Sequence, residues 1–170
     1  DSTYEDISAC FTDVNNDGFS DLVVGSGGNQ FRGKDHYLEP RIYLNDGNGN
    51  FHKKEDSFDS VFVNASCMVP YDFNGDGNVD LFIGGRSVPG SYGQVPQSYL
   101  LQNDGTGKFK DVTEKQAKGL SDAGFITSAL WFDIDKDGDK DLILTLERGG
   151  IVAFINDHVT FIKKMLTDKK

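Results

Sequence analysis

The sequence predicts an all-β fold, a partial β-propeller of about three four-stranded antiparallel blades, from three observations. A nine-residue acidic loop occurs at residues 13–21, 72–80 and 133–141, and successive copies begin 59 and 61 positions apart. A short apolar, largely β-branched run such as Leu22-Val23-Val24 follows each loop, which is typical of a buried strand. A turn beginning with Asn-Asp then recurs at residues 45–49, 103–107 and 156–158. A period near 60 residues with four strands in each unit is the pattern of a propeller blade.

Each unit is expected to hold four strands in a fixed order. The first strand enters the acidic loop, the second leaves it, the third leads to the Asn-Asp turn, and the fourth opens on an aromatic residue. The expected first strands are 7–11, 66–71 and 127–132, the second 22–25, 81–84 and 142–145, and the third 41–44, 98–102 and 151–155, with fourth strands opening at Phe51, Phe109 and Phe161. The blades of this single domain are expected at about residues 1–56, 57–115 and 116–170. The third turn has no glycine and is one residue shorter, but it is still expected to form a hairpin.

The acidic loops carry oxygen donors at positions 1, 3, 5 and 9, which is the chemistry that calcium prefers. Position 7 is expected to offer its backbone carbonyl, so its side chain can vary. Glycine at position 6 suits a left-handed backbone conformation. The loops therefore predict up to three Ca²⁺ ions, and the third loop, with four aspartates at donor positions, is expected to bind most tightly if Lys136 and Lys140 point outward. The expected ligands are Asp13, Asn15, Asp17, Phe19 and Asp21; Asp72, Asn74, Asp76, Asn78 and Asp80; and Asp133, Asp135, Asp137, Asp139 and Asp141.

Two other interpretations of these loops are weaker. An EF-hand requires a glutamate at position 12 and flanking helices, whereas position 12 here is Val24, Ile83 or Leu144. Ordinary Asn/Asp/Gly turns between strands would explain one copy, but three copies with the same donor positions favour a metal. Zinc and copper fit poorly because no cysteine or histidine lies in any loop.

Charge and composition exclude several classes of function. The net charge of −10 contradicts nucleic-acid binding through a basic patch. No run of about 18 apolar residues is present, so no membrane span is predicted. No catalytic triad is visible among the three histidines. Cys10 and Cys67 fall on equivalent strands, and the sequence leaves open whether they pair or remain buried thiols. Trp131 and Phe132 are expected in the core.

Two stretches resemble a known repeat. Tyr99-Leu-Leu-Gln-Asn-Asp-Gly-Thr-Gly-Lys-Phe-Lys-Asp-Val-Thr113 and Ala129-Leu-Trp-Phe-Asp-Ile-Asp-Lys-Asp-Gly138 resemble FG-GAP (VCBS-type) repeats, the calcium-loop blades also found in integrin α-subunits, and in particular a bacterial secreted or surface subgroup. The resemblance implies a β-propeller and placement outside the cell, at the cell surface or facing the periplasm. The Phe-Gly and Gly-Ala-Pro segments that gave the repeat its name are not legible here. Family propellers usually have seven blades, so the remaining blades are expected either from a longer chain or from self-association. A longer chain is the favoured interpretation.

The connections between second and third strands are long in two units, at residues 25–40 and 84–97, and should emerge opposite the acidic loops. Long loops on a rigid scaffold are a common recognition layout. Aromatic and cationic side chains there would suit a carbohydrate or a protein, although they could equally cover the blade edges. The candidate ligand-binding residues are Phe31, Arg32, Lys34, His36, Tyr37, Arg86 and Tyr92.

The sequence therefore favours a non-enzymatic calcium-binding propeller segment that recognises a carbohydrate or protein on the face opposite the acidic loops. Two alternatives stay open. One is the propeller portion of a polysaccharide-degrading enzyme of the lyase type, and the other is a purely structural adhesion module.

Overall fold

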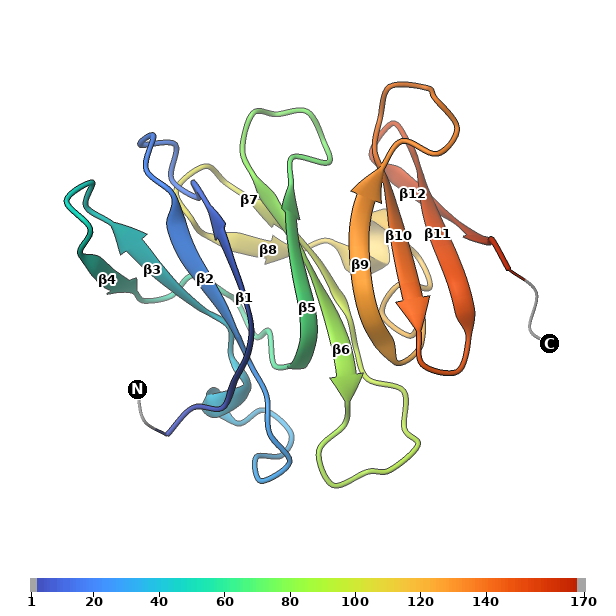
Figure 1. Ribbon diagram of the computed structural model, residues 1–170, viewed down its shortest axis with the longest axis horizontal. Helices are drawn as coiled ribbons and strands as arrows, with labels where there is room; N and C mark the ends of the chain where they lie inside the picture. Colours follow the sequence, from blue (N-terminus) through green and yellow to red (C-terminus); the bar gives the residue numbers. More distant parts are fainter. Residues whose placement is uncertain (1–2, 168–170) are drawn as a thin grey trace.

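The computed structural model describes residues 3–167 and contains three four-stranded antiparallel sheets that lie side by side (Figure 1). The sheets have the strand orders β1-β2-β3-β4, β5-β6-β7-β8 and β9-β10-β11-β12, so chain neighbours pair throughout. This arrangement confirms the all-β prediction of propeller-like blades. The strands are β1 (Asp6–Thr12), β2 (Asp21–Ser26), β3 (Arg41–Asn45), β4 (Phe51–Lys54), β5 (Asn64–Tyr71), β6 (Asp80–Ser87), β7 (Tyr99–Asn103), β8 (Phe109–Asp111), β9 (Ile126–Phe132), β10 (Asp141–Leu146), β11 (Gly150–Asp157) and β12 (Thr160–Met165).

Two short helical turns, the 3₁₀ helix η1 (His36–Leu38) and α1 (Thr113–Gln116), interrupt the connections. The turn between β11 and β12 is a hairpin although it has no glycine. His158 and Val159 instead take left-handed backbone angles, with φ of 49° and 74°, and the backbone N–H of Val159 donates to Asn156 Oδ1 at 2.9 Å. Two successive residues with positive φ are what a two-residue hairpin of the primed type requires.

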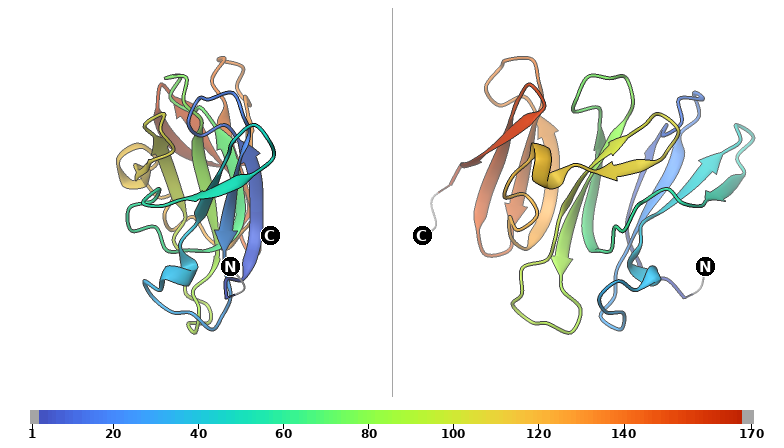
Figure 2. Two further views of the ribbon diagram at one scale, coloured as in Figure 1. Left: turned by 90° about the vertical axis from the view of Figure 1, so that its left-hand side faces the viewer. Right: turned by 180° about the vertical axis from the view of Figure 1, so that it is seen from behind.

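The strands that enter the acidic loops, β1, β5 and β9, lie next to one another, so adjacent sheets face each other (Figures 1 and 2). Apolar side chains fill the two spaces between the sheets. The first core joins Val23 and Ile42 of the first sheet to Leu81 and Leu101 of the second. The second core joins Phe82 of the second sheet to residues of the third such as Leu142, Phe154 and Phe161.

Trp131 and Phe132 have different environments, although both were expected in the core. Trp131 packs against Tyr71 and Phe73, and its Nε1 donates to the backbone carbonyl of Val69 at 3.1 Å. Phe132 is 59% exposed. The prediction was wrong for Phe132 because alternate residues of a strand point to opposite faces, and no sheet formed by residues 3–167 covers the face of β9 that carries Phe132.

Asparagines at the ends of the third strands connect one sheet to the sheet before it. Asn103 Nδ2 donates to the backbone carbonyl of Val14 in the first acidic loop at 2.8 Å. Asn156 Nδ2 makes the equivalent bond to the carbonyl of Phe73 in the second acidic loop at 3.1 Å. Both bonds are buried. The asparagine of the first sheet, Asn45, has no preceding sheet among the described residues, and its Nδ2 donates to Ser20 in its own blade.

The two ends of the row of sheets expose the positions that are buried between sheets. Phe109 and Phe161 are 2% and 4% exposed, but their equivalent in the first sheet, Phe51, is 41% exposed. At the other end, Leu130, Phe132 and Ile134 are 51%, 59% and 38% exposed. Each end of the row of sheets therefore exposes apolar side chains whose equivalents between the sheets are buried or partly buried.

Cys10 and Cys67 are free thiols, which settles the choice that the sequence left open. Each is partly buried beside a different core, Cys10 at the first and Cys67 at the second. Burial raises the pKa of the Cys10 thiol to about 11, which keeps it protonated at neutral pH.

Replacing Asn103 or Asn156 by alanine is expected to lower the free energy of unfolding by about 1–3 kcal/mol, because a buried carbonyl of the preceding sheet loses its donor. Asn45→Ala is the matched control. It removes the same turn interactions, but its side-chain amide bonds only within its own blade. Urea denaturation of the three variants measures the difference, and equal losses for all three would show that the inter-sheet bond contributes nothing.

Candidate metal loops and the opposite face

The last aspartate of each acidic loop is fully buried and organises its blade. One carboxylate oxygen of Asp21 accepts from the backbone N–H of Val14 at 3.0 Å, and the other accepts from that of Asn45 at 2.8 Å. The same pair of bonds recurs in the other two blades. Asp80 accepts from Phe73 and Asn103 at 3.3 and 2.8 Å, and Asp141 from Ile134 and Asn156 at 2.9 and 2.8 Å. This carboxylate therefore ties the acidic loop to the end of the third strand.

Burial makes the ionised form of a carboxylate costly. Burial raises the pKa of Asp80 to about 7, although the hydrogen bond from Asn103 opposes the shift. Burial also raises the pKa of Asp21. A bound cation would supply the missing positive charge and favour the ionised form.

The first aspartate shapes the loop itself. Its Oδ2 accepts from the backbone N–H of the position-6 glycine in every copy, at 2.8 Å for Asp13, 2.9 Å for Asp72 and 3.2 Å for Asp133. Those glycines have φ of 88°, 86° and 102°, as the sequence predicts for a left-handed position. Position 4 is also left-handed in all three copies, at Asn16, Gly75 and Lys136, with φ of 59°, 70° and 66°. Asn16 and Gly75 are residue types that favour left-handed backbone angles, so the sequence held a signal for this position in two of the three loops.

The third loop gathers its carboxylates tightly. Oxygens of Asp133, Asp135 and Asp141 lie within 4.8 Å of one another. Two oxygens on opposite sides of a calcium ion, each at roughly 2.3–2.6 Å, would lie about 4.6–5.2 Å apart, so the spacing fits this ion. Desolvation and the nearby charges of Asp137 and Asp141 raise the pKa of Asp135. A cation would relieve this repulsion.

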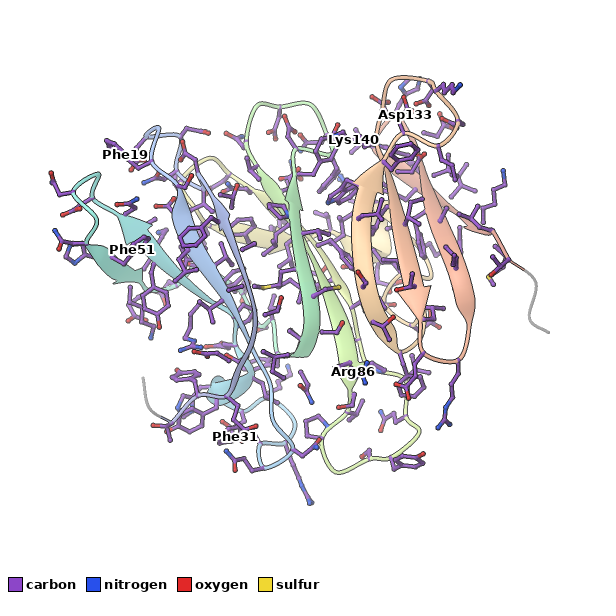
Figure 3. The ribbon with its side chains drawn as sticks, viewed as in Figure 1. Phe19, Phe31, Phe51, Arg86, Asp133 and Lys140 are labelled. Carbon is purple, nitrogen blue, oxygen red and sulfur yellow. The ribbon has the colours of Figure 1, made fainter. Side chains whose placement is uncertain are left out.

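The two lysines of the third loop do not neutralise the cluster by ion pairing among the described residues. Lys140 Nζ lies 4.7 Å from the centre of the Tyr71 ring, on the neighbouring sheet, and Figure 3 places Lys140 on that side of the loop. Lys136 is exposed. Lys140 therefore points away from the acidic cluster, as the prediction of tightest calcium binding in the third loop requires. The affinity itself stays a prediction.

The opposite face is built from the connections between second and third strands, at the other end of the sheets from the acidic loops (Figures 1 and 3). A cavity of about 770 Å³ opens there and takes residues from all three blades. Contacts between blades hold its rim. Arg86 Nη2 lies 3.7 Å from Glu147 Oε2, and Arg148 Nη2 donates to Tyr92 Oη at 3.3 Å.

The predicted ligand-binding residues divide into two groups. Arg86 and Tyr92 line the cavity. The aromatic residues of the first connection pack on one another outside it, with Tyr37 at 4.6 Å from Phe31 and 3.9 Å from His36 between ring centres. Arg32 packs against Gly90, since a Cβ on this glycine would lie 2.8 Å from Arg32 Nε. Lys34 is exposed. The structure thus brings only two of the seven candidates to the cavity.

Sequence reasoning missed the linking asparagines and most of the cavity. Asn45, Asn103 and Asn156 recur immediately before an aspartate in every unit, which was a legible signal. Glu5, Asn64 and Arg148 line the cavity from separate blades and share no spacing or motif. Such a set becomes visible only when the blades are assembled.

A family model of the FG-GAP-like repeat matches residues 13–83 and 72–144, which together cover most of the chain and all three acidic loops. The chain belongs to the FG-GAP-like repeat family. The two matched units each run from one acidic loop to the strand after the next loop, in keeping with the repeat of the sheets. A search of curated proteins found no match.

Among solved structures, this chain is similar to a lectin from Agrocybe aegerita. The structure of that lectin is described as the basis of its specific recognition of non-reducing terminal N-acetylglucosamine. The match covers 94% of this chain and 38% of the lectin chain, with 20% sequence identity and a TM-score of 0.50. At this identity the likeness shows the fold alone. The chain spans well under half the length of the lectin.

No helix among residues 3–167 has the length and apolar character needed to cross a membrane.

Proposed function

We propose that this chain is a non-enzymatic, calcium-stabilised propeller segment that binds a carbohydrate or protein ligand on the face opposite its acidic loops. The cavity that all three blades build on that face is the observation that carries the proposal. A concave site with apolar walls and a few convergent polar groups is the usual form of a ligand pocket. The lectin named among the similar structures adds a carbohydrate to the ligands worth testing first.

Calcium is proposed as a structural ion in all three loops. Oxygen-only donors, the spacing of the third cluster and the buried carboxylates support this ion. The residues that would hold it are the side chains at positions 1, 3, 5 and 9 of each loop, with the carbonyl of position 7. Bound calcium would supply positive charge to the buried aspartates, and those aspartates in turn hold the acidic loop and the third strand together.

We also propose an extracellular or cell-surface location and membership of the bacterial, VCBS-type subgroup. Loops of this kind, if their affinities resemble those of extracellular modules at roughly 10⁻⁴–10⁻³ M, fill with calcium only outside the cytosol. The sequence resemblance stated above is the remaining support.

Calcium is expected to raise the midpoint of thermal unfolding and EDTA to lower it, because the ion binds the folded state. At a free concentration 100 times the Kd, one site contributes about 2.7 kcal/mol. Asp17→Ala is expected to remove one of three sites in calorimetric titration, and Lys108→Ala, in the turn between β7 and β8, serves as a control. A midpoint that ignores both calcium and EDTA would contradict the structural ion.

Ligand binding is expected to depend on the long connection between β6 and β7. A variant in which residues 88–95 are replaced by a short Gly-Ser linker should lose the ligands that the calcium-loaded chain selects from a glycan array and a panel of purified extracellular proteins. The Asp17→Ala variant, which is changed on the other face, should still bind these ligands when it is assayed below its own unfolding temperature. Unsaturated products released from acidic polysaccharides would instead indicate the lyase alternative, and an absence of any ligand would favour the adhesion module.

The remaining blades are proposed to come from a longer chain or from a second copy, whose blades would cover the exposed end faces. Two copies would supply six blades, which lies within the range of known propellers. The isolated chain is therefore expected to show a concentration-dependent mass above 18.7 kDa in light scattering. Phe132→Asp should reduce this association, and Val95→Asp, at another exposed apolar residue, should not. A strictly monomeric chain up to high concentration would refute association through these faces.

A further inference from the structure

We propose that the cavity on the face opposite the acidic loops is a site for a neutral saccharide, held between charged groups of both signs, and not for an acidic polysaccharide. This inference rests on the proposed function and names the class of ligand. Four features of the cavity carry it: its walls from three blades, its balanced charge, its buried amide and its exposed aromatic ring.

The cavity lies where the blades converge. Glu5 and Ile7 come from the start of β1, Asn64 from the start of β5, Arg86 from the end of β6, and Glu147 and Arg148 from the turn between β10 and β11. Its volume of about 770 Å³ falls within the roughly 300–1,000 Å³ of small-molecule sites. The connection between β6 and β7 adds Val88 and residues 90–94 to the lining, next to these residues at the ends of paired strands.

Charged groups in the cavity cancel in number. Arg86 and Arg148 line the cavity together with Glu5 and Glu147, and Arg86 Nη2 lies 3.7 Å from Glu147 Oε2. A polyanion would meet two glutamates here in a chain whose net charge is −10. Sugar hydroxyls both donate and accept hydrogen bonds, so carboxylates and guanidinium groups side by side can each pair with them. The charge pattern therefore favours a neutral polyol over an acidic sugar.

A buried amide adds polar capacity to one wall. Asn64 is 6% exposed, and its Nδ2 donates to Ser87 Oγ at 2.9 Å. Its Oδ1 is buried and has no hydrogen-bond partner among residues 3–167. A buried acceptor without a donor costs about 1–3 kcal/mol. Asn64 and Ser87 thus supply a polar pair to this wall of the cavity, and burial of Asn64 makes it a poor attachment point for a glycan despite its Asn64-Ala65-Ser66 sequon.

Apolar surface completes the site. Ile7, Val88 and Phe125 line the cavity, and the Tyr92 ring stands at its rim with 96% of the residue exposed. Arg148 Nη2 bonds to the Tyr92 hydroxyl and so restrains the ring. An aromatic face presented to solvent provides a stacking surface for the C–H face of a sugar ring, and the hydroxyl remains available for polar contact.

The test uses the calcium-loaded chain and two matched sets of immobilised probes, with binding followed by interferometry. The neutral set comprises cello-, xylo-, manno- and chito-oligosaccharides, and the acidic set comprises oligogalacturonates and hyaluronan fragments. Neutral probes are expected to bind, and Tyr92→Ala and Arg86→Gln are each expected to weaken binding by about tenfold or more. Lys110→Gln removes the same charge from β8, outside the cavity, and should change binding by less than about twofold.

Each variant residue is at least about half exposed, so unchanged thermal midpoints are expected to accompany the loss of binding. Acidic probes that bind as tightly as the neutral ones or more tightly, or neutral binding that Tyr92→Ala and Arg86→Gln leave intact, would overturn this inference and leave carbohydrate recognition by the chain standing. A protein ligand with no glycan binding would also overturn it while keeping the broader function. Failure of every glycan and protein probe would overturn both.

Discussion

The buried aspartate at the end of each acidic loop is the interaction on which the rest of the structure depends. Asp21, Asp80 and Asp141 have no solvent exposure, and each carboxylate bonds to the loop with one oxygen and to the end of the third strand with the other. One charged group thus fixes the register of three segments. Burial of a carboxylate disfavours its ionised form, which is consistent with the raised pKa of Asp80 and with the cation proposed for these loops.

The same carboxylates extend their effect across blades through the linking asparagines. The backbone N–H of Asn103 donates to Asp80, while its side chain donates to the preceding loop at Val14. Asn156 repeats this arrangement one blade later. Each acidic loop is consequently held by its own blade and by the next one. A repeat protein whose units contact only their neighbours depends on such links, and a blade without a neighbour leaves apolar surface exposed, as at Phe51 and Phe132.

Rigidity at one face has a consequence at the other. The second strand of each blade runs from the acidic end and the third runs back to it, so the connections between them lie together at the opposite end (Figure 3). Contacts such as Arg86 with Glu147 and Arg148 with Tyr92 then join the second and third blades. A scaffold fixed at the acidic loops can in this way hold the connections of different blades together around one cavity.

The sequence by itself determined the repeat, the four strands in each unit and the left-handed glycine of each acidic loop, because period, strand alternation and glycine placement are local properties. It gave Asp80 as an expected calcium ligand but did not reveal that the same carboxylate accepts hydrogen bonds from Phe73 and Asn103. It also placed Phe132 in the core, where the structure does not put it. Only the tertiary structure decided which residues face one another across blades. Glu5, Asn64, Arg86 and Arg148 meet in one cavity although about 140 residues separate the first from the last. No local sequence pattern predicts that these residues are close in space, because their proximity follows from how the sheets stack. Stacking in turn depends on side-chain packing between strands that are distant in the sequence.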